Sequence, residues 1–288
     1  SEADQLVELE GGARLSSLCF EGPSERLNRT DVSQPALFTC GLACHAGMVE
    51  HGGERPIAGA LGLSLGEYTA LALAGAFTFV EGLRLVATRG RLMQRAAEAS
   101  KGGMVALIGA DEARAMEVCD AAAKGQVLVP ANFNAPGQIV LSGHAEACDR
   151  AVEVAGALGL RATKLAVAGA FHSPLMAPAA EGMARALEHV TFKPLRCPVW
   201  SNVTGKPHAA TDAATLKSLL VDQIVKPVRW DACCLDMLSW RKAQGLEGSA
   251  SLHEMAPGNV LRGLMRRIDR SAEVTNHDTI EEPQRAKA

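Results

Sequence analysis

The sequence of 288 residues predicts an α/β protein in which a small subdomain is inserted into a larger domain. The outer parts, residues 1–101 and 169–288, alternate short apolar runs with helix-forming runs, which is typical of a mostly parallel sheet with helices on both faces. The middle part, residues 102–168, has the order β-α-β-β-α-β, which is the split arrangement of ferredoxin-like subdomains. Gly102 and Gly169 mark its two ends.

Short apolar runs bounded by glycine or polar residues define the elements of this middle part. Its expected strands are 104–108, 127–132, 138–142 and 161–165, and its expected helices are 111–124 and 145–158. The chain contains no internal repeat, no low-complexity tract and no phosphate-binding loop pattern. We therefore expect one inserted subdomain and one larger α/β domain.

The turn Gly62-Leu63-Ser64-Leu65-Gly66 joins an apolar run, 56–61, to a helix-forming run, 67–74. A G-x-S-x-G pattern between a strand and a helix is typical of a nucleophile elbow, in which the serine sits on a tight bend. The glycines avoid clashes that a Cβ would cause, and the helix N-terminus points at the serine oxygen. Ser64 is therefore a candidate for forming acyl esters.

Two other interpretations of this stretch are a glycine-rich packing site and a membrane span over residues 56–80. Glu67 and the glycines near the centre of that range argue against a span. The net charge of -3 selects no class of partner, and we expect neither a nucleic acid nor a membrane as one. The length and composition fit a soluble intracellular protein.

The eight cysteines form no C-x-x-C pair and have no spacing with the histidines that is typical of a metal site. We therefore expect free thiols in a reducing compartment, with neither disulfides nor a metal. Asn28-Arg29-Thr30 and Asn202-Val203-Thr204 match the N-glycosylation pattern, but no secretory signal is in view. We interpret both matches as coincidental.

His172 is the candidate general base, because it lies in a loop of small residues just after the inserted subdomain. A neutral imidazole there could accept the serine proton and return it to a leaving group. The alternative is a histidine with a purely structural role. The other histidines lie mostly in polar helical or loop contexts without comparable apolar flanks: His45, His51, His144, His189, His208, His253 and His277.

Arg89 lies on the apolar side of the helix predicted over residues 80–98, together with Leu85, Met93 and Ala96. The polar stripe of that helix consists of Arg84, Thr88, Arg91 and Arg95. A buried guanidinium needs an anion, and its planar fork suits a carboxylate. Two partners fit equally well at this point, a carboxylate of the protein or a carboxylate of a substrate.

These residues stand among ordered motifs that resemble the malonyl-CoA:acyl-carrier-protein transacylases of fatty acid synthesis and the related acyltransferase domains of polyketide synthases. The resemblance extends over nearly the whole chain. The matching segments are 21–23, 27–28, 34–37, 62–70, 89–90, 93–94, 132–138, 142–143, 169–176, 201–203, 223, 227–230 and 257–261. Because the motifs occur in order and at the family spacing, together they are far more specific than any one alone.

The resemblance implies a hydrolase-like α/β core with a ferredoxin-like insert, and it implies the catalytic roles. Ser64 would be the nucleophile and His172 its base. A backbone carbonyl at Gln223 would orient the base, so that no aspartate is needed, and the backbone N–H of Leu65 would be one donor of the oxyanion hole. Arg89 would bind the malonyl carboxylate, which selects the substrate as its partner.

The same resemblance implies the substrates and the remaining site residues. Malonyl-CoA would acylate the serine, and the phosphopantetheine thiol of acyl-carrier protein would then remove the malonyl group in a ping-pong reaction. No cofactor or metal is implied, since CoA and phosphopantetheine arrive with the substrates. Phe171 resembles the malonyl-selecting form of its motif, and Asn132 and Asn134 match positions expected to bind substrate.

The helix that begins near Asn259 carries an outward-facing cationic edge made of Arg262, Arg266 and Arg267. Acyl-carrier proteins are acidic, so we expect this edge to steer their docking. The alternative is an ordinary solvated face with no partner.

Two departures from the family pattern affect the prediction. The family's N-terminal Gly-Gln-Gly loop, whose glutamine supplies a second oxyanion donor, is absent, and we expect the sequence to be part of a longer protein. Loss of one such donor costs on the order of a hundredfold in rate.

Leu63 stands where many bacterial members have histidine, and this position and residues 166–172 resemble plant-type members. The plastid stroma is therefore the expected location, with the bacterial cytoplasm as the alternative.

Other functions remain open at this point. A polyketide-pathway acyltransferase shares every motif, and so does a catalytically silent domain, although intact Ser64, Arg89 and His172 argue against the latter. A serine thioester hydrolase would use the same elbow with water as the acceptor. Arg89 and the absence of the Ser-Asp-His chain order disfavour the hydrolase.

Overall fold

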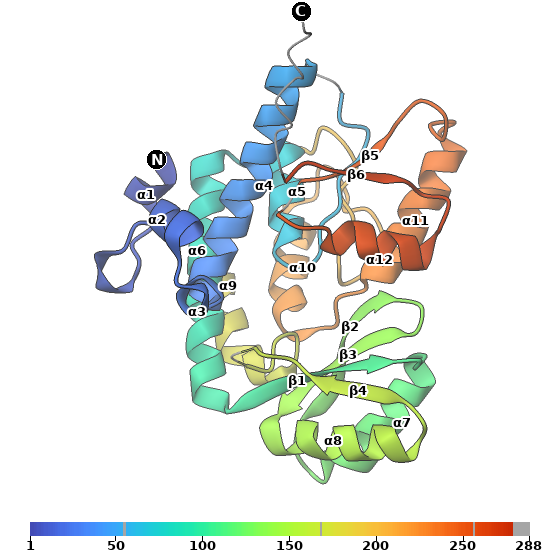
Figure 1. The fold of residues 1–288 in the computed structure, drawn as a ribbon. Helices are drawn as coiled ribbons and strands as arrows, with labels where there is room; N and C mark the ends of the chain where they lie inside the picture. The colour runs from blue at the N-terminus through green and yellow to red at the C-terminus, as the bar shows by residue number, and fades with distance from the viewer. Residues whose placement is uncertain (54–55, 168, 256, 279–288) are drawn as a thin grey trace, which may run out of the picture.

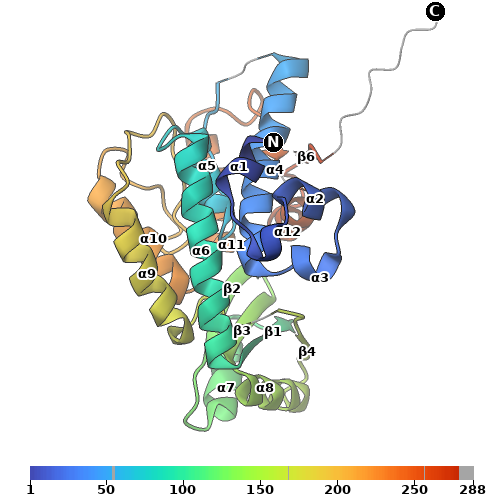
Figure 2. The same cartoon turned by 90° about the vertical axis from the view of Figure 1, so that its left-hand side faces the viewer.

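The computed structural model describes residues 1–53, 56–167, 169–255 and 257–278, and they form an α/β fold (Figure 1). The N-terminal elements are α1 (Glu2–Leu6), η1 (Glu10–Gly12), α2 (Leu15–Glu21), α3 (Ser24–Leu27), α4 (Thr30–Gly52) and α5 (Gly66–Leu73). The C-terminal helices are η2 (Pro174–Met176), α9 (Ala177–Glu188), α10 (Ala213–Val225), α11 (Trp230–Ala243) and α12 (Val260–Ile268). Helix α6 (Phe79–Ser100) packs between α4 and α9 (Figure 2).

Helix α6 carries the buried arginine that the helical spacing predicts. Thr78 and Glu81 form a capping box at its start. The predicted polar stripe, which includes Arg91, is exposed or half-buried, whereas Arg89 is buried among apolar neighbours. The helix therefore presents one charged side chain to the interior of the protein.

The small sheet is antiparallel, with the strand order β2-β3-β1-β4. Its strands are β1 (Gly102–Ile108), β2 (Leu128–Ala135), β3 (Gln138–His144) and β4 (Arg161–Lys164). Helices α7 (Glu112–Ala123) and α8 (Ala145–Ala157) cover one face of it (Figure 1), where Val105, Leu107 and Leu141 are fully buried. The chain order of these elements is the β-α-β-β-α-β order that the sequence predicts.

The boundaries of the two expected domains stay a prediction. Ala168, the last residue of the expected subdomain, lies outside the described residues, and so does the segment 279–288 of the expected larger domain. Within the described part, the apolar core of the small sheet forms a cluster of its own, separate from the larger cluster that contains the interior of α6.

Parallel pairing in the larger part is short within the described residues. Strand β5 (Leu252–Glu254) pairs with β6 (Val274–Asn276), and the strand expected before the elbow pairs through a single parallel bridge between Ala60 and Val199. The ladder stops on one side of this bridge because Pro198 has no N–H to donate.

On the other side of the bridge, Asn202 replaces the ladder with side-chain bonds. Its backbone N–H donates to Glu67 Oε2 at 3.0 Å instead of to the neighbouring strand. Its side-chain Nδ2 donates to the carbonyl of Gly62 at 2.9 Å. The end of the paired segment is thus tied directly to the serine turn.

All eight cysteines are free thiols, as predicted. Within the described residues, no group of three or more His, Cys, Asp or Glu side chains is arranged to hold a metal ion. In that same part of the chain, no helix is long and apolar enough to cross a membrane.

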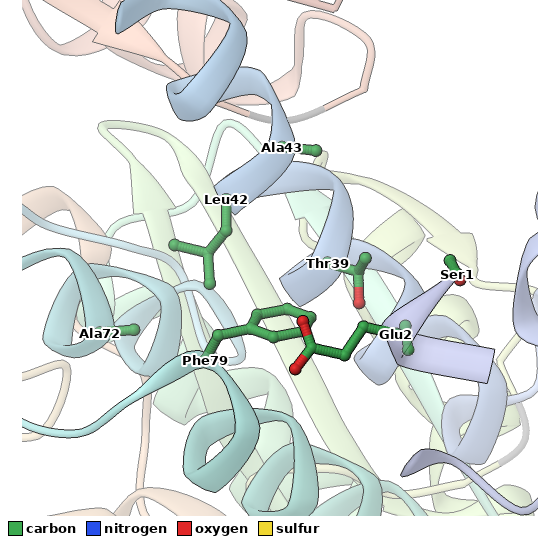
Figure 3. A pocket seen from close by; sticks show the side chains of 8 residues that line it. Ser1, Glu2, Thr39, Leu42, Ala43, Ala72 and Phe79 are labelled. Carbon is green, nitrogen blue, oxygen red and sulfur yellow. The ribbon is translucent and has the colours of Figure 1, made fainter. Parts of the chain in front are cut away.

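A pocket opens between α1, α4 and the start of α6 (Figure 3). It is lined by Ser1, Glu2, Ala3, Thr39, Leu42, Ala43, Ala72 and Phe79. None of the residues predicted to take part in catalysis or substrate binding lines it. The candidate site therefore lies elsewhere, where α5, α6 and α10 meet.

Candidate active site

Ser64 lies on a tight turn just before helix α5. Its φ of 51° falls in the left-handed region, which is strained for a residue other than glycine and fits a nucleophile elbow. A Cβ on Gly62 would lie 2.0 Å from the carbonyl carbon of Gly66, so the turn requires glycine at position 62. A Cβ on Gly66 would meet nothing within 4 Å, so the expectation that both glycines avoid a clash is wrong for Gly66.

Ser64, His172 and Gln223 form a hydrogen-bonded chain. Ser64 Oγ lies 2.8 Å from His172 Nε2, and His172 Nδ1 lies 2.7 Å from the backbone carbonyl oxygen of Gln223. A carbonyl oxygen only accepts, so the proton of the neutral ring is on Nδ1 and Nε2 is left to accept from the serine. The structure thus brings the serine, the histidine and the Gln223 carbonyl together, and their catalytic roles stay predictions.

The environment of His172 favours its neutral form. The residue is buried, and burial together with the positive charge of Arg89 lowers the pKa of its imidazole from 6.5 to about 4, against a smaller opposite effect of the bond to Gln223. The ring is therefore unprotonated near neutral pH, which is the state a general base needs.

Arg89 brings an almost fully buried guanidinium, 1% exposed, to the serine. Its Nη1 donates to Gln34 Oε1 at 2.6 Å, and its Nη2 donates to Ser64 Oγ at 3.1 Å and to Gln223 Oε1 at 2.8 Å. It also lies over the ring of Tyr68, 5.5 Å from the ring centroid.

No Asp or Glu of the described residues forms a salt bridge with Arg89, and its Nε has no hydrogen-bond partner there. Burial lowers the pKa of the guanidinium. The alternative of a direct ion pair with the protein is therefore not found in the described part of the chain. The hydrogen-bond partners of the fork in the described residues are all neutral, and the fork remains suited to an external anion.

Asn202 and Gln223 hold the backbone of the serine turn. Ser64 N–H donates to Asn202 Oδ1 at 2.6 Å, and Gln223 Nε2 donates to the Ser64 carbonyl at 3.0 Å. The N–H of Leu65 has no partner among the described residues, and Leu65 is the N-cap residue of α5, at the helix end where N–H groups favour an anion. It is available as an oxyanion donor.

Several residues of this network were not predicted from the sequence. Gln34 and Asn202 appeared only within matching segments, and the fully buried Asn202 belongs to a glycosylation pattern, whose interpretation as coincidental fits that burial. Glu67 lies in the matching segment 62–70, but the sequence pattern predicts no role for it at the site. His208 has no apolar flanks in the sequence that would predict its burial, yet it is 6% exposed and its Nε2 lies 2.7 Å from Glu67 Oε1. A pair 141 residues apart leaves no local signal.

The predicted substrate residues lie near the sheet but form no hydrogen bond with the serine network in the described residues. Phe171 is half-buried and packs with Met104 and Val140. Asn132 is buried on β2, and its backbone forms a parallel bridge with Val228. Asn134 Oδ1 is buried without a partner among the described residues. Their roles stay predictions.

The predicted cationic edge lies on α12, and Arg262, Arg266 and Arg267 are all exposed. Only two of the three line a groove between α12 and the β2–β3 turn. The groove is lined by Pro136, Gln138, Asn259, Val260, Gly263, Leu264, Arg266, Arg267 and Arg270. The structure thus adds Arg270 to the positive surface and separates Arg262 from it.

The chain matches the model of the acyl transferase domain over residues 1–273. It is 43% identical over 258 residues to the malonyl CoA-acyl carrier protein transacylase of Salmonella typhimurium. The aligned residues make up 89% of this chain and 80% of that protein. The solved transacylase of Coxiella burnetii superposes with a TM-score of 0.86 at 38% identity, covering 96% of this chain and 85% of that one. A malonyl-transacylase was solved in complex with its type II polyketide synthase acyl-carrier protein. It superposes with a TM-score of 0.86 at 38% identity, covering 96% of this chain and 86% of that one.

The organisms of the named relatives are bacteria, so the expected plastid location finds no support among them. The match to the domain model covers nearly the whole chain, and the compared transacylases align over most of their own length. The serine turn, the neutral histidine and the buried arginine lie within the matched residues. This chain therefore belongs to the acyl transferase domain family.

Proposed function

We propose that this chain transfers a malonyl group from malonyl-CoA to the phosphopantetheine thiol of an acyl-carrier protein, and so supplies fatty acid synthesis. The observation that carries the proposal is the buried guanidinium of Arg89, which lies 3.1 Å from Ser64 Oγ and whose hydrogen-bond partners among the described residues are all neutral. Its fork suits the free carboxylate of a malonyl group whose thioester carbon lies at the serine. The similarity to named malonyl CoA-acyl carrier protein transacylases supports the same substrates.

The first half-reaction acylates Ser64. His172 Nε2 accepts the hydroxyl proton as Ser64 Oγ attacks the thioester carbon, whose carbonyl oxygen becomes an oxyanion. We assign the N–H of Leu65 as a donor to this oxyanion. The tetrahedral intermediate then collapses, the C–S bond breaks, and the proton on His172 passes to the sulfur of the departing CoA.

The second half-reaction repeats these steps with a different thiol. The phosphopantetheine thiol gives its proton to His172 Nε2 and attacks the malonyl ester, and Ser64 Oγ takes that proton as it leaves. The carbonyl of Gln223 keeps the ring in the required tautomer throughout. Arg89 holds the carboxylate away from the reacting carbon in both halves.

We assign Phe171, Asn132 and Asn134 to the substrate side of the site. Phe171 directly precedes the base and packs beside Met104 and Val140, and we expect its ring to border the space in which the acyl group must fit. Asn134 Oδ1 is a buried acceptor without a partner among the described residues, which suits an amide N–H of the pantetheine arm. Bound substrate should therefore satisfy a group that the free protein leaves open.

The α12 edge is the surface that we assign to the carrier protein. Arg266 and Arg267 line the groove against the β2–β3 turn, and their charge complements an acidic partner. Reversing both charges should slow discharge of the malonyl enzyme to carrier protein and leave acylation by malonyl-CoA unchanged. Reversal of Arg185, exposed on α9, is the matched control. Equal losses in both half-reactions would refute docking at α12.

Mass spectrometry of the intact protein tests the reaction directly. Incubation with a mixture of malonyl-CoA, acetyl-CoA and methylmalonyl-CoA should leave a malonyl ester on Ser64, and Ser64→Ala should leave none. Added holo acyl-carrier protein should remove the malonyl ester on the time scale of one catalytic turnover. Rapid loss of the ester to water without carrier protein would instead identify a thioester hydrolase.

A second candidate acceptor is the carrier protein of a polyketide pathway. One structural neighbour was solved with a type II polyketide synthase acyl-carrier protein bound, and it is as similar to this chain as the other transacylases compared. Discharge rates with the two classes of carrier protein distinguish the pathways. Of the two locations expected from the sequence, the bacterial one fits the organisms of the relatives.

A further inference from the structure

Glu67 is a fully buried carboxylate beneath the serine turn, and the mechanism above does not use it. Its Oε2 accepts from Gln223 Nε2 at 2.7 Å and from the Asn202 backbone N–H at 3.0 Å. Its Oε1 lies 2.7 Å from His208 Nε2, whose ring is also buried. Each oxygen of the carboxylate therefore has at least one donor, as a buried charge requires.

The bond from Gln223 to Glu67 determines which end of the Gln223 amide faces Arg89. A carboxylate only accepts, so the NH₂ group of Gln223 must point to Glu67, where it also reaches the Ser64 carbonyl. The oxygen of the amide is then left for Arg89 Nη2, at 2.8 Å. The reversed amide would direct its NH₂ at the guanidinium, donor against donor.

The same carboxylate also fixes Asn202, whose side chain accepts from Ser64 N–H. Glu67 thus orders the side-chain amide of Gln223, which contacts both the serine turn and the arginine. It also holds the backbone of Asn202, whose side chain contacts the same turn. It does so without contacting the guanidinium itself, which leaves the fork of Arg89 open to an anion. Groups in one buried hydrogen-bond network are coupled in this way, and removing one member affects the others.

We propose that Glu67 is a positioning residue for carboxylate selection, which acts on Arg89 through the amide of Gln223 and is held in place by His208. The proposal rests on the proposed function, since it concerns how Arg89 is aimed at the malonyl carboxylate. Glu67 touches no substrate atom in this scheme. Its effect should appear in the choice between acyl groups more than in the stability of the fold.

Glu67→Asp tests the proposal because it keeps the charge and shortens the reach by one methylene. The readout is the ratio of acylation rates with malonyl-CoA and acetyl-CoA, measured by intact mass spectrometry and normalised to folded protein by circular dichroism. We expect the ratio to fall roughly tenfold with Arg89 present and less than about twofold in Arg89→Ala, since the effect passes through the arginine.

Glu254→Asp is the matched control. Glu254 is also a buried carboxylate, 2% exposed, but it accepts from the backbone N–H groups of Leu261 and Arg262 at the start of α12. The same shortening there should lower thermal stability and leave the acyl ratio unchanged. His208→Ala, which removes one donor from Glu67, should shift the ratio in the same direction by roughly threefold, and it provides the test if Glu67→Asp does not fold.

If Glu67→Asp lowered the acylation rates with malonyl-CoA and acetyl-CoA by the same factor, the proposal would be refuted. It would also be refuted if the malonyl-to-acetyl rate ratio fell equally in the presence of Arg89 and in Arg89→Ala. Either result would make Glu67 a structural residue only. These outcomes are distinct from failure of the proposed function, which would appear as an absent malonyl ester or an absent preference for malonyl-CoA in the unsubstituted protein.

Discussion

Gly62→Ala tests whether the close approach of two glycines sets the position of the nucleophile. The added Cβ would lie 2.0 Å from the carbonyl carbon and 2.1 Å from the carbonyl oxygen of Gly66, both of them backbone atoms. Ordinary van der Waals contact begins near 3.4 Å, so the turn must open by about 1.4 Å. Ser64 lies between the two glycines and must move with it.

The expected effect is a loss of both rate and stability. A displacement of about 1 Å at a reacting group costs roughly a hundredfold in rate. Here the displacement would break the 2.8 Å contact between Ser64 Oγ and His172 Nε2. Overpacking of a tight interior site lowers the free energy of unfolding by about 1–3 kcal/mol. Gly62→Ala should therefore acylate about a hundredfold more slowly and melt at a lower temperature.

Gly66→Ala is the matched control within the same motif. Its Cβ would meet no atom of the described residues within 4 Å, and its φ is not positive, so alanine fits there and suits the first residue of α5. Acylation of Ser64 by malonyl-CoA, followed by mass spectrometry, should proceed near the unsubstituted rate. Full activity in Gly62→Ala, or an equal loss in both variants, would refute the reasoning.

Arg89→Lys keeps the charge but loses the planar fork, so the preference for malonyl-CoA over acetyl-CoA in a competition assay should fall roughly tenfold. An unchanged preference would mean that the malonyl carboxylate binds elsewhere. The acid limb of kcat/KM should lie near pH 4, where neutral His172 gains its proton, and Arg89→Ala should move that limb to higher pH. A limb that stays in place would contradict this coupling. Asn202→Ala removes the acceptor of Ser64 N–H, so mass spectrometry of quenched time points should show acylation slowed roughly tenfold. An unchanged acylation rate would show that the serine turn does not need this hydrogen bond.

Some features of the site follow from the local sequence. The apolar run, the glycine turn and the helix-forming run around Ser64 are contiguous, so the elbow can be predicted without knowledge of distant contacts. The helical period alone assigns Arg89 to the apolar side of α6, and the structure confirms its burial. The β-α-β-β-α-β order of the small sheet also follows from runs of neighbouring residues.

The partners of these groups were decided only by the tertiary structure. Gln34 lies 55 residues from Arg89 in the sequence, Asn202 lies 135 from Glu67, and the Glu67–His208 pair spans 141. A buried polar group must find a partner, but the sequence does not say which one, because that depends on how distant helices and loops pack. The sequence thus identified a serine, a histidine and an arginine. The packing of remote segments decided that, within the described residues, the arginine hydrogen-bonds only neutral groups, which leaves its fork available for a substrate carboxylate.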